Sequence, residues 1–193
     1  MRYKLTIFVG LLLMLVVATV PAALNVSAEL IDRIKIKFGN EAAERVLIWQ
    51  QLIDSSKTLG EKEKLERVNS FFNQQIEFVD DEYLWGLNDY WATPLEVLSK
   101  GAGDCEDYAI AKYFTLRELG VADSKMRITY VKALELNQAH MVLTFFETPR
   151  SIPLVLDNLI PAIKVATSRR DLLPVYSFNG SGLWLAKTRG GGK

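Results

Sequence analysis

A helical segment that is apolar on almost every side, residues 105–119, constrains the fold more than any other feature of the sequence. A helix with so little polar surface has to be buried in the middle of a domain. After Gly120 the apolar period changes to two, and segments rich in Val, Ile, Thr and Phe follow at 127–133, 141–147 and 152–157. Helices first and strands second predict an α+β fold, in which a central helix packs on an antiparallel β-sheet.

Shorter sequence patterns predict further secondary-structure elements before and after this helix in the chain. Apolar residues at helical spacing predict N-terminal helices over 40–55 and 60–76, and an acidic, aromatic loop over 80–88 follows. Thr93, Pro94 and Glu96 are typical of a helix start, with Gly101 as its end. Asp104 is expected to cap the central helix. A last pair of strands, 175–178 and 183–187, is joined by the turn 179–182.

The first 28 residues have the composition of an export signal. Arg2 and Lys4 precede an apolar run over 5–20, and Pro21 and small residues follow. The run is short for a membrane span, which needs roughly 20 apolar residues. We expect cleavage near Ala22 or Ala28, with an uncleaved N-terminal anchor as the alternative. The sequence therefore predicts an exported chain with one domain over 29–188 and a flexible tail over 189–193.

Composition excludes several function classes. The chain has 23 basic and 23 acidic side chains, so it lacks the positive surplus of a nucleic-acid binder. It also shows no nucleotide-binding motif. One cysteine excludes an intrachain disulfide framework and a cysteine-cluster zinc site. One histidine excludes a two-histidine metal site.

Cys105 is placed at the first turn of the central helix, directly after the segment Gly101-Ala102-Gly103-Asp104. Unpaired backbone N–H groups at a helix start stabilise a thiolate and can also receive an oxyanion. A buried, inert cysteine is the general alternative. The position at a helix start, rather than in mid-helix, favours a functional thiol.

His140 and Asp157 are the partners that such a thiol needs. They are expected at the start of one strand and the end of another, and adjacent antiparallel strands could bring them together. The carboxylate would then hold the imidazole in the tautomer that faces the thiol. A bystander histidine and a turn aspartate remain the alternatives.

Acidic residues surround the predicted nucleophile. Asp104, Glu106 and Asp107 could supply hard oxygen ligands to a cation, but from the residues alone capping and dipole compensation are the favoured interpretation. Carboxylates beside Cys105 would also raise the pKa of the thiol unless a cation neutralises them.

Other polar and aromatic groups are weaker candidates, and each has a structural alternative. The acidic loop is expected to be solvated, with an extended acidic binding surface as the alternative. Two tryptophans could wall a substrate cleft or pack in the core. A charged group near the C-terminus is expected to be a surface ion-pair group of little energetic value. The acidic loop contains Asp80, Asp81, Glu82 and Asp89, the tryptophans are Trp85 and Trp91, and the charged group near the C-terminus consists of Arg169, Arg170 and Asp171.

Three ordered blocks of sequence resemble a known family. They are Gly103-Asp104-Cys105-Glu106-Asp107-Tyr108-Ala109, Ala139-His140-Met141-Val142-Leu143 and Leu156-Asp157-Asn158, preceded by Tyr90-Trp91-Ala92-Thr93-Pro94-Leu95-Glu96. Together they resemble the bacterial transglutaminase-like cysteine proteinases, and among these the LapG-type periplasmic proteases, over roughly residues 40 to 188.

The resemblance implies a papain-like, transglutaminase-like fold and a catalytic triad. Cys105 would be the nucleophile, His140 the general base and acid, and Asp157 the residue that orients the imidazole. It also implies Ca²⁺ as cofactor, with Asp104 and Glu106 as ligands and Asp107 as a further oxygen donor.

A biological role is implied by the same resemblance. The substrate would be the N-terminal region of a large surface adhesin, whose release promotes biofilm dispersal. The periplasmic domain of an inner-membrane cyclic-di-GMP receptor would sequester the protease. Two alternatives stay open: an acyltransferase with the same triad, and a non-catalytic calcium-binding module.

Overall fold

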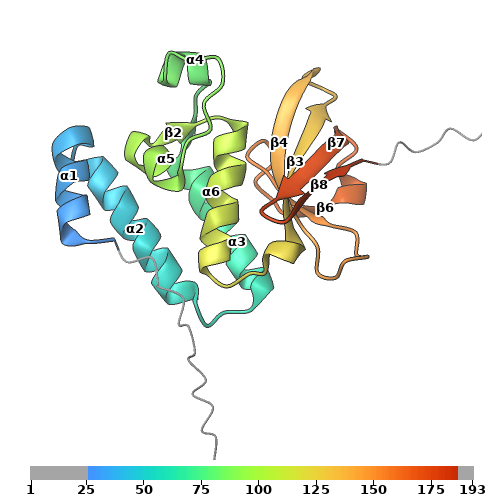
Figure 1. Cartoon of the computed structure of the whole chain (residues 1–193), viewed down its shortest axis with the longest axis horizontal. Helices are drawn as coiled ribbons and strands as arrows, with labels where there is room; N and C mark the ends of the chain where they lie inside the picture. Colours follow the sequence, from blue (N-terminus) through green and yellow to red (C-terminus); the bar gives the residue numbers. More distant parts are fainter. Residues whose placement is uncertain (1–25, 187–193) are drawn as a thin grey trace, which may run out of the picture.

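The computed structural model describes residues 26–186, and these form a helical half and a sheet half (Figure 1). Helix α6 lies between α1, α2 and α5 on one side and the six-stranded sheet on the other, and α3 passes behind it (Figure 1). The predicted α+β fold is confirmed. The longer helices are α1 (Ala28–Phe38), α2 (Asn40–Ser56), α3 (Glu61–Gln75), α5 (Pro94–Lys100) and α6 (Cys105–Glu118).

Burial of α6 is confirmed. Its residues Ala111 and Leu116 are completely buried, and the helix contacts α3 and α5 on one side and the strands β3 (Met126–Ala133) and β4 (Gln138–Phe145) on the other. Its polar residue Thr115 is also buried and accepts a hydrogen bond of 3.0 Å from the indole of Trp49 in α2, whereas Phe114 and Arg117 of the same helix are exposed. Helix α6 is therefore the centre of the core, and its first residue, Cys105, lies at the rim of that core.

Helix α5 begins and ends as its sequence predicts. The Thr93 hydroxyl accepts from the backbone of Glu96, and the Glu96 carboxylate accepts from the backbone of Thr93 at 2.9 Å, which forms a capping box. Gly101 ends the helix in the left-handed region at φ 72°, which only glycine adopts without strain. The chain is thus turned sharply just before the predicted nucleophile.

The sheet has six antiparallel strands in the order β6-β5-β4-β3-β7-β8. Strand β4 lies next to β5, with Leu143 opposite Leu156, as the predicted meeting of His140 and Asp157 requires. Pro174 in β7 lies where the register with β3 shifts, a place where a residue without an N–H is tolerated. The remaining strands of this sheet are β5 (Leu154–Leu156), β6 (Lys164–Val165), β7 (Leu172–Asn179) and β8 (Gly182–Leu185).

Several elements were not predicted. Helix α1 was not, and Asp81–Leu84 forms the one-turn helix α4 inside the expected loop. The parallel pair β1 (Glu77–Phe78) and β2 (Ala102–Gly103) is too short to give a periodic signal. Strand β4 begins at Gln138 rather than at 141, because pairing with β3 extends it. His140 is therefore its third residue, and Asp157 is the first residue after β5.

The ends of the chain bear on the predicted leader and tail. Residues 1–25 of the predicted leader and the predicted tail, 189–193, lie outside the described residues. Ser27, within the predicted leader, caps α1 by accepting a hydrogen bond of 3.2 Å from the backbone of Leu30. Over residues 26–186 the helices are all too short or too polar to cross a membrane.

Candidate active site

The backbone before α6 is held on both sides, and this fixes where Cys105 lies. Strand β2 pairs with β1, and the N–H groups of Glu77 and Val79 donate to the carbonyls of Gly101 and Gly103 at 2.9 and 3.1 Å. A Cβ on Gly103 would come within 2.8 Å of Asp107 Oδ2, so only glycine allows the chain to pass this close to α6.

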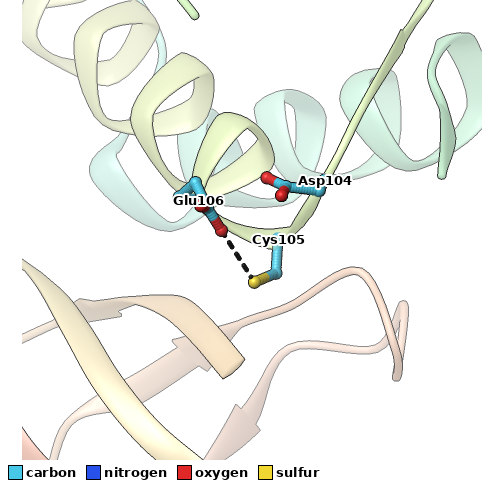
Figure 2. Close-up of side chains that lie close together, drawn as sticks. All are labelled: Asp104, Cys105 and Glu106. Atoms are coloured by element: carbon cyan, nitrogen blue, oxygen red, sulfur yellow. Dashed lines mark hydrogen bonds between the residues drawn. The ribbon is translucent and has the colours of Figure 1, made fainter. Parts of the chain in front are cut away.

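The thiol of Cys105 points from the start of α6 toward the strands of the sheet (Figure 2). It donates a hydrogen bond of 3.0 Å to Glu106 Oε2 (Figure 2), and the backbone N–H of Met141 in β4 donates to the sulfur. The sulfur thus lies against the peptide bond that joins His140 to Met141. Within residues 26–186, the side-chain partner of the thiol is Glu106 and not His140.

The electrostatic surroundings of the thiol oppose its ionisation. Burial raises the pKa of Cys105, and the carboxylate of Glu106 raises it further. In this arrangement burial and the acidic neighbour outweigh the stabilisation that the backbone N–H of Met141 gives to a thiolate. The carboxylates of Glu106 and Asp104 both raise the pKa of Cys105, in the direction that the sequence predicts for acidic neighbours of the thiol.

His140 and Asp157 meet as the sequence predicts. His140 Nε2 lies 2.7 Å from Asp157 Oδ1, and both side chains are buried. Burial alone would raise the pKa of Asp157, but hydrogen bonds from His140 and Arg169 outweigh burial and hold that pKa below its ordinary value. An ionised carboxylate only accepts hydrogen bonds, so Nε2 must carry the hydrogen. Nδ1 is then the ring atom that can accept a proton, as a general base requires.

Arg169 corrects one prediction. It was expected on the surface, yet its side chain is 1% exposed, and Nη2 donates to Asp157 Oδ2 at 2.7 Å. The same guanidinium binds Asp171 through Nη2 at 2.7 Å and Nε at 3.0 Å. The second carboxylate oxygen of Asp157 is therefore bound by a buried cation.

The backbone of Asp157 is also held. Its carbonyl accepts from the amide of Asn73 at 2.8 Å and from Lys112 Nζ at 3.1 Å. Lys112, on α6, also donates to Asn73 Oδ1 at 2.8 Å, and its complete burial lowers its pKa to about 7. Side chains of helices α3 and α6 thus hold the backbone of the loop after β5 in place.

A cluster of carboxylates lies on the other side of Cys105. Asp104 and Glu106 each offer an oxygen near Cys105, and both also belong to wider groups that include Asp81. One group is Asp81, Asp104 and Asp107, and another is Asp81, Asp89 and Glu106; within each group the oxygens lie within 4.8 Å of one another. Five acidic side chains from α4, the following loop and the start of α6 therefore gather beside Cys105.

The capping interpretation of these acids is wrong for Asp104. Asp104 occupies the N-cap position of α6, but its side chain makes no cap hydrogen bond. Within the described part of the chain, three buried oxygens of the cluster have no hydrogen-bond partner: Asp81 Oδ1, Asp104 Oδ1 and Asp107 Oδ2. Asp107 uses its other oxygen to accept from the backbone of Ala92 at 2.8 Å. Unpartnered buried carboxylate oxygens are costly, and they are what a hard cation coordinates.

The pKa values of the carboxyl groups in the cluster also indicate that these groups lack a positively charged partner. Burial raises the pKa of Asp104 to about 8, and the Glu106 carboxylate adds to this rise. Burial likewise raises the pKa of Asp107 to about 7, with Asp81 nearby, and it raises the pKa of Asp81. Protons or a cation must therefore compensate this site.

The remaining candidates divide between core and surface. Trp85 packs on Tyr90, with ring centroids 4.6 Å apart, and lies under Lys100 Nζ. Trp91 is 45% exposed and stacks on Phe178 of β7 at 5.8 Å. In the acidic loop Asp80, Glu82 and Asp89 are exposed as expected, but Asp81 is buried and accepts a hydrogen bond from the backbone of Tyr90.

Sequence reasoning missed Arg169 and Lys112 as neighbours of the site, and it considered Asp81 only as part of an extended acidic binding surface, the alternative to a solvated loop. Asp81 and Arg169 are flanked by polar residues that suggest a solvated surface. Lys112 stands out in the sequence as the one charge in the apolar middle of α6, and a buried charge needs partners. That signal could have predicted a polar network beneath the site.

Comparisons with known proteins agree with this geometry. The sequence profile of the bacterial transglutaminase-like cysteine proteinases matches residues 40–184. The EGTA-treated structure of Legionella pneumophila LapG is 50% identical, with a TM-score of 0.75, over 84% of this chain and 87% of that chain. The calcium-bound structure of the same protein is 51% identical, with a TM-score of 0.74, over 85% and 90%.

A third structure of Legionella pneumophila LapG is 49% identical, with a TM-score of 0.74, over 84% of this chain and 90% of that chain. The comparison with curated protein sequences gives no match. Both the family match and the identity extend over most of the chain, and the fold is the transglutaminase-like fold that the resemblance implied. The chain therefore belongs to the bacterial transglutaminase-like cysteine proteinases and is a cysteine peptidase of the LapG type.

Proposed function

We propose that the chain is a calcium-dependent cysteine endopeptidase with the triad Cys105, His140 and Asp157. One observation carries the proposal. The only cysteine of the chain lies at the start of a buried helix, against the peptide bond of the only histidine, and that histidine is paired with a buried aspartate. A structural cysteine and a bystander histidine have no reason to meet in this way.

The chemistry follows from these positions. His140 Nδ1 accepts the thiol proton, and the sulfur of Cys105 attacks the scissile carbonyl carbon. Backbone N–H groups at the start of α6 receive the developing oxyanion. The C–N bond then breaks as His140 returns the proton to the leaving amine, which leaves a thioester on Cys105. Water, deprotonated by His140, hydrolyses the thioester and regenerates the thiol.

Calcium fits the carboxylate cluster. Asp81, Asp104 and Asp107 would hold the ion through the oxygens that have no partner, with Glu106 and Asp89 as further donors. Bound there, the ion would supply positive charge that offsets the carboxylates and so lowers the cost of ionising Cys105. The calcium-bound and EGTA-treated structures of Legionella pneumophila LapG support this assignment.

The substrate and the setting of the reaction are proposed on the resemblance. The substrate is an alanine-rich site in the N-terminal region of a large surface adhesin, and its cleavage releases the adhesin and disperses biofilm. The chain acts in the periplasm, after export by its N-terminal segment. The periplasmic domain of an inner-membrane receptor for cyclic-di-GMP sequesters it, and the nucleotide itself binds the receptor and not this chain.

Cleavage of a defined substrate tests the proposal. The purified protein is incubated with the N-terminal segment of the adhesin, in calcium and in EGTA, and the products are identified by mass spectrometry. We expect one cut in calcium, no cut in EGTA, and no cut with Cys105→Ala, which keeps the helix start because alanine suits it. Cleavage by Cys105→Ala would remove the nucleophile.

Two further measurements distinguish the alternatives. An added amine found at the new C-terminus of the product would indicate acyl transfer rather than hydrolysis. Fractionation of cells, with and without the receptor, tests the periplasmic location and the sequestration: the protein is expected in the periplasmic fraction and in complex with the receptor domain. A cytoplasmic fraction alone would contradict both.

A further inference from the structure

We propose that Arg169 is a positioning residue, which fixes the carboxylate of Asp157 so that His140 keeps its hydrogen on Nε2 and leaves Nδ1 free to accept a proton. This inference deepens the proposed function and rests on it for its catalytic consequence. The arrangement of the ring hydrogen does not depend on any reaction, so that part can be measured separately.

The geometry divides the two oxygens of Asp157 between two partners. Oδ1 lies 2.7 Å from His140 Nε2, and Oδ2 accepts from Arg169 Nη2 at 2.7 Å. Oδ1 also accepts from the backbone N–H of Leu159 at 3.1 Å. With one oxygen bound to the guanidinium, the carboxylate cannot rotate about its own axis without losing a charge-assisted hydrogen bond. Arg169 therefore determines which carboxylate oxygen of Asp157 faces His140 Nε2.

Arg169 is itself prevented from moving. Asp171 accepts hydrogen bonds from Nη2 and Nε of Arg169, which form one edge of the planar guanidinium. Nη2, at the end of that edge, also donates to Asp157. The side chains of Arg169 and Asp157 are 1% and 0% exposed, while that of Asp171 is 24% exposed. The cation thus stands between a buried and a partly exposed carboxylate.

Electrostatics give Arg169 a second effect on the same group. Asp157 is fully buried, and without cationic partners burial would raise its pKa. The charged or titratable groups that face it are His140 from β4, Lys112 from α6, and Arg169 with Asp171 from the segment before β7. Arg169 is the only one of these that donates to the carboxylate and stays cationic at every working pH. It keeps Asp157 ionised, and an ionised Asp157 keeps the hydrogen on Nε2.

Nuclear magnetic resonance of the histidine ring tests the inference directly. His140 is the only histidine, so ¹⁵N-labelled histidine gives the signals of one imidazole. In the wild type we expect the ring with a single hydrogen to carry it on Nε2. In Arg169→Gln the two tautomers should mix, because the carboxylate is no longer held. Arg170→Gln, at an exposed arginine one position away, is the matched control and should behave as the wild type.

Kinetics at saturating calcium test the catalytic consequence on the adhesin segment. Arg169→Gln should lower kcat by about 10- to 100-fold, the cost typical of losing a partner behind a reacting group, with little change in KM. In this variant the acidic limb of the pH profile of kcat/KM should move to higher pH, because the pKa of Asp157 rises when Arg169 is lost. Arg169→Lys keeps the charge, so the limb should stay in place while kcat falls.

The outcomes separate the two proposals. An Arg169→Gln protein with the wild-type tautomer and pH profile, and only a lower melting temperature, would show a structural role and overturn the inference. If Arg169→Gln does not fold, Arg169→Lys decides: wild-type kcat in this variant would contradict positioning by the planar fork. If the wild type cuts nothing, the proposed function fails, and the ring tautomer in the variants still decides the role of Arg169.

Discussion

At the scale of single residues, Gly103 shows how closely the carboxylate cluster is built into the backbone. A Cβ at this position would lie 2.8 Å from Asp107 Oδ2 and 2.9 Å from Asp107 Cβ. Asp107 is completely buried and tied to Ala92, so it has little room to move away. A side chain at 103 would therefore push a proposed ligand out of place.

Gly103→Ala is expected to weaken calcium binding by about tenfold or more, the size of effect seen when support behind a metal ligand is lost. Isothermal titration calorimetry of the calcium-depleted protein measures the affinity. Gly60→Ala is the matched control, because a Cβ on Gly60 meets nothing within 4 Å. Equal affinities for the two variants would mean that Asp107 is not a ligand.

The site residues differ in how far the sequence could predict them. Cys105, His140 and Asp157 stand in short blocks of characteristic sequence, and their placement needed only a helix start and two neighbouring strands. Arg169 and Asp81 could not be predicted, because their burial depends on packing against residues distant in the sequence. Arg169, for instance, is buried where it meets Asp157, 12 positions earlier.

At the scale of elements, the one-turn helix α4 and the first turn of α6 bring acidic residues together without compensating cations. Burial raises the pKa of Asp104 to about 8 and of Asp107 to about 7, against an ordinary value of 3.8. A carboxyl with a raised pKa in the folded state stabilises the fold below its unfolded pKa. This contribution is lost as the pH rises through the folded pKa.

The calcium-depleted protein should therefore have a melting temperature that falls as the pH rises from 5 to 7. Saturating calcium should abolish this fall, because the ion replaces the protons, and Asp107→Asn should reduce it. The window ends at pH 7 because Lys112, with its pKa lowered to about 7, contributes the opposite slope above it. Scanning calorimetry measures the slope, and a melting temperature that rises over this window without calcium would contradict the electrostatics of the cluster.

Helices with strong local signals could be predicted closely, whereas very short strands and the ends of strands that depend on pairing could not. The capping box of α5 and the apolar pattern of α6 are local, so both ends of each helix were placed to within a residue. The parallel pair β1–β2 exists because distant segments meet, and the start of β4 is set by β3. Yet β1 and β2 hold the backbone just before Cys105.

At the scale of the whole molecule, the two halves of the fold carry different parts of the site. The helical half supplies Cys105 and the carboxylate cluster, and the sheet supplies His140, Asp157 and Arg169. They meet where the N–H of Met141 reaches the sulfur at the start of α6. Calcium binding on the helical half would therefore alter the thiol that the sheet half has to activate.

The rate of alkylation of the single cysteine by iodoacetamide, followed by intact mass as a function of pH, tests this coupling most directly. Only the thiolate reacts, and one cysteine gives one mass increment. At neutral pH we expect fast alkylation with calcium and slow alkylation without it, because burial and then Glu106 hold the pKa of the Cys105 thiol high. Equal rates in the two conditions, with calcium binding verified by calorimetry, would contradict a nucleophile that the carboxylate cluster controls.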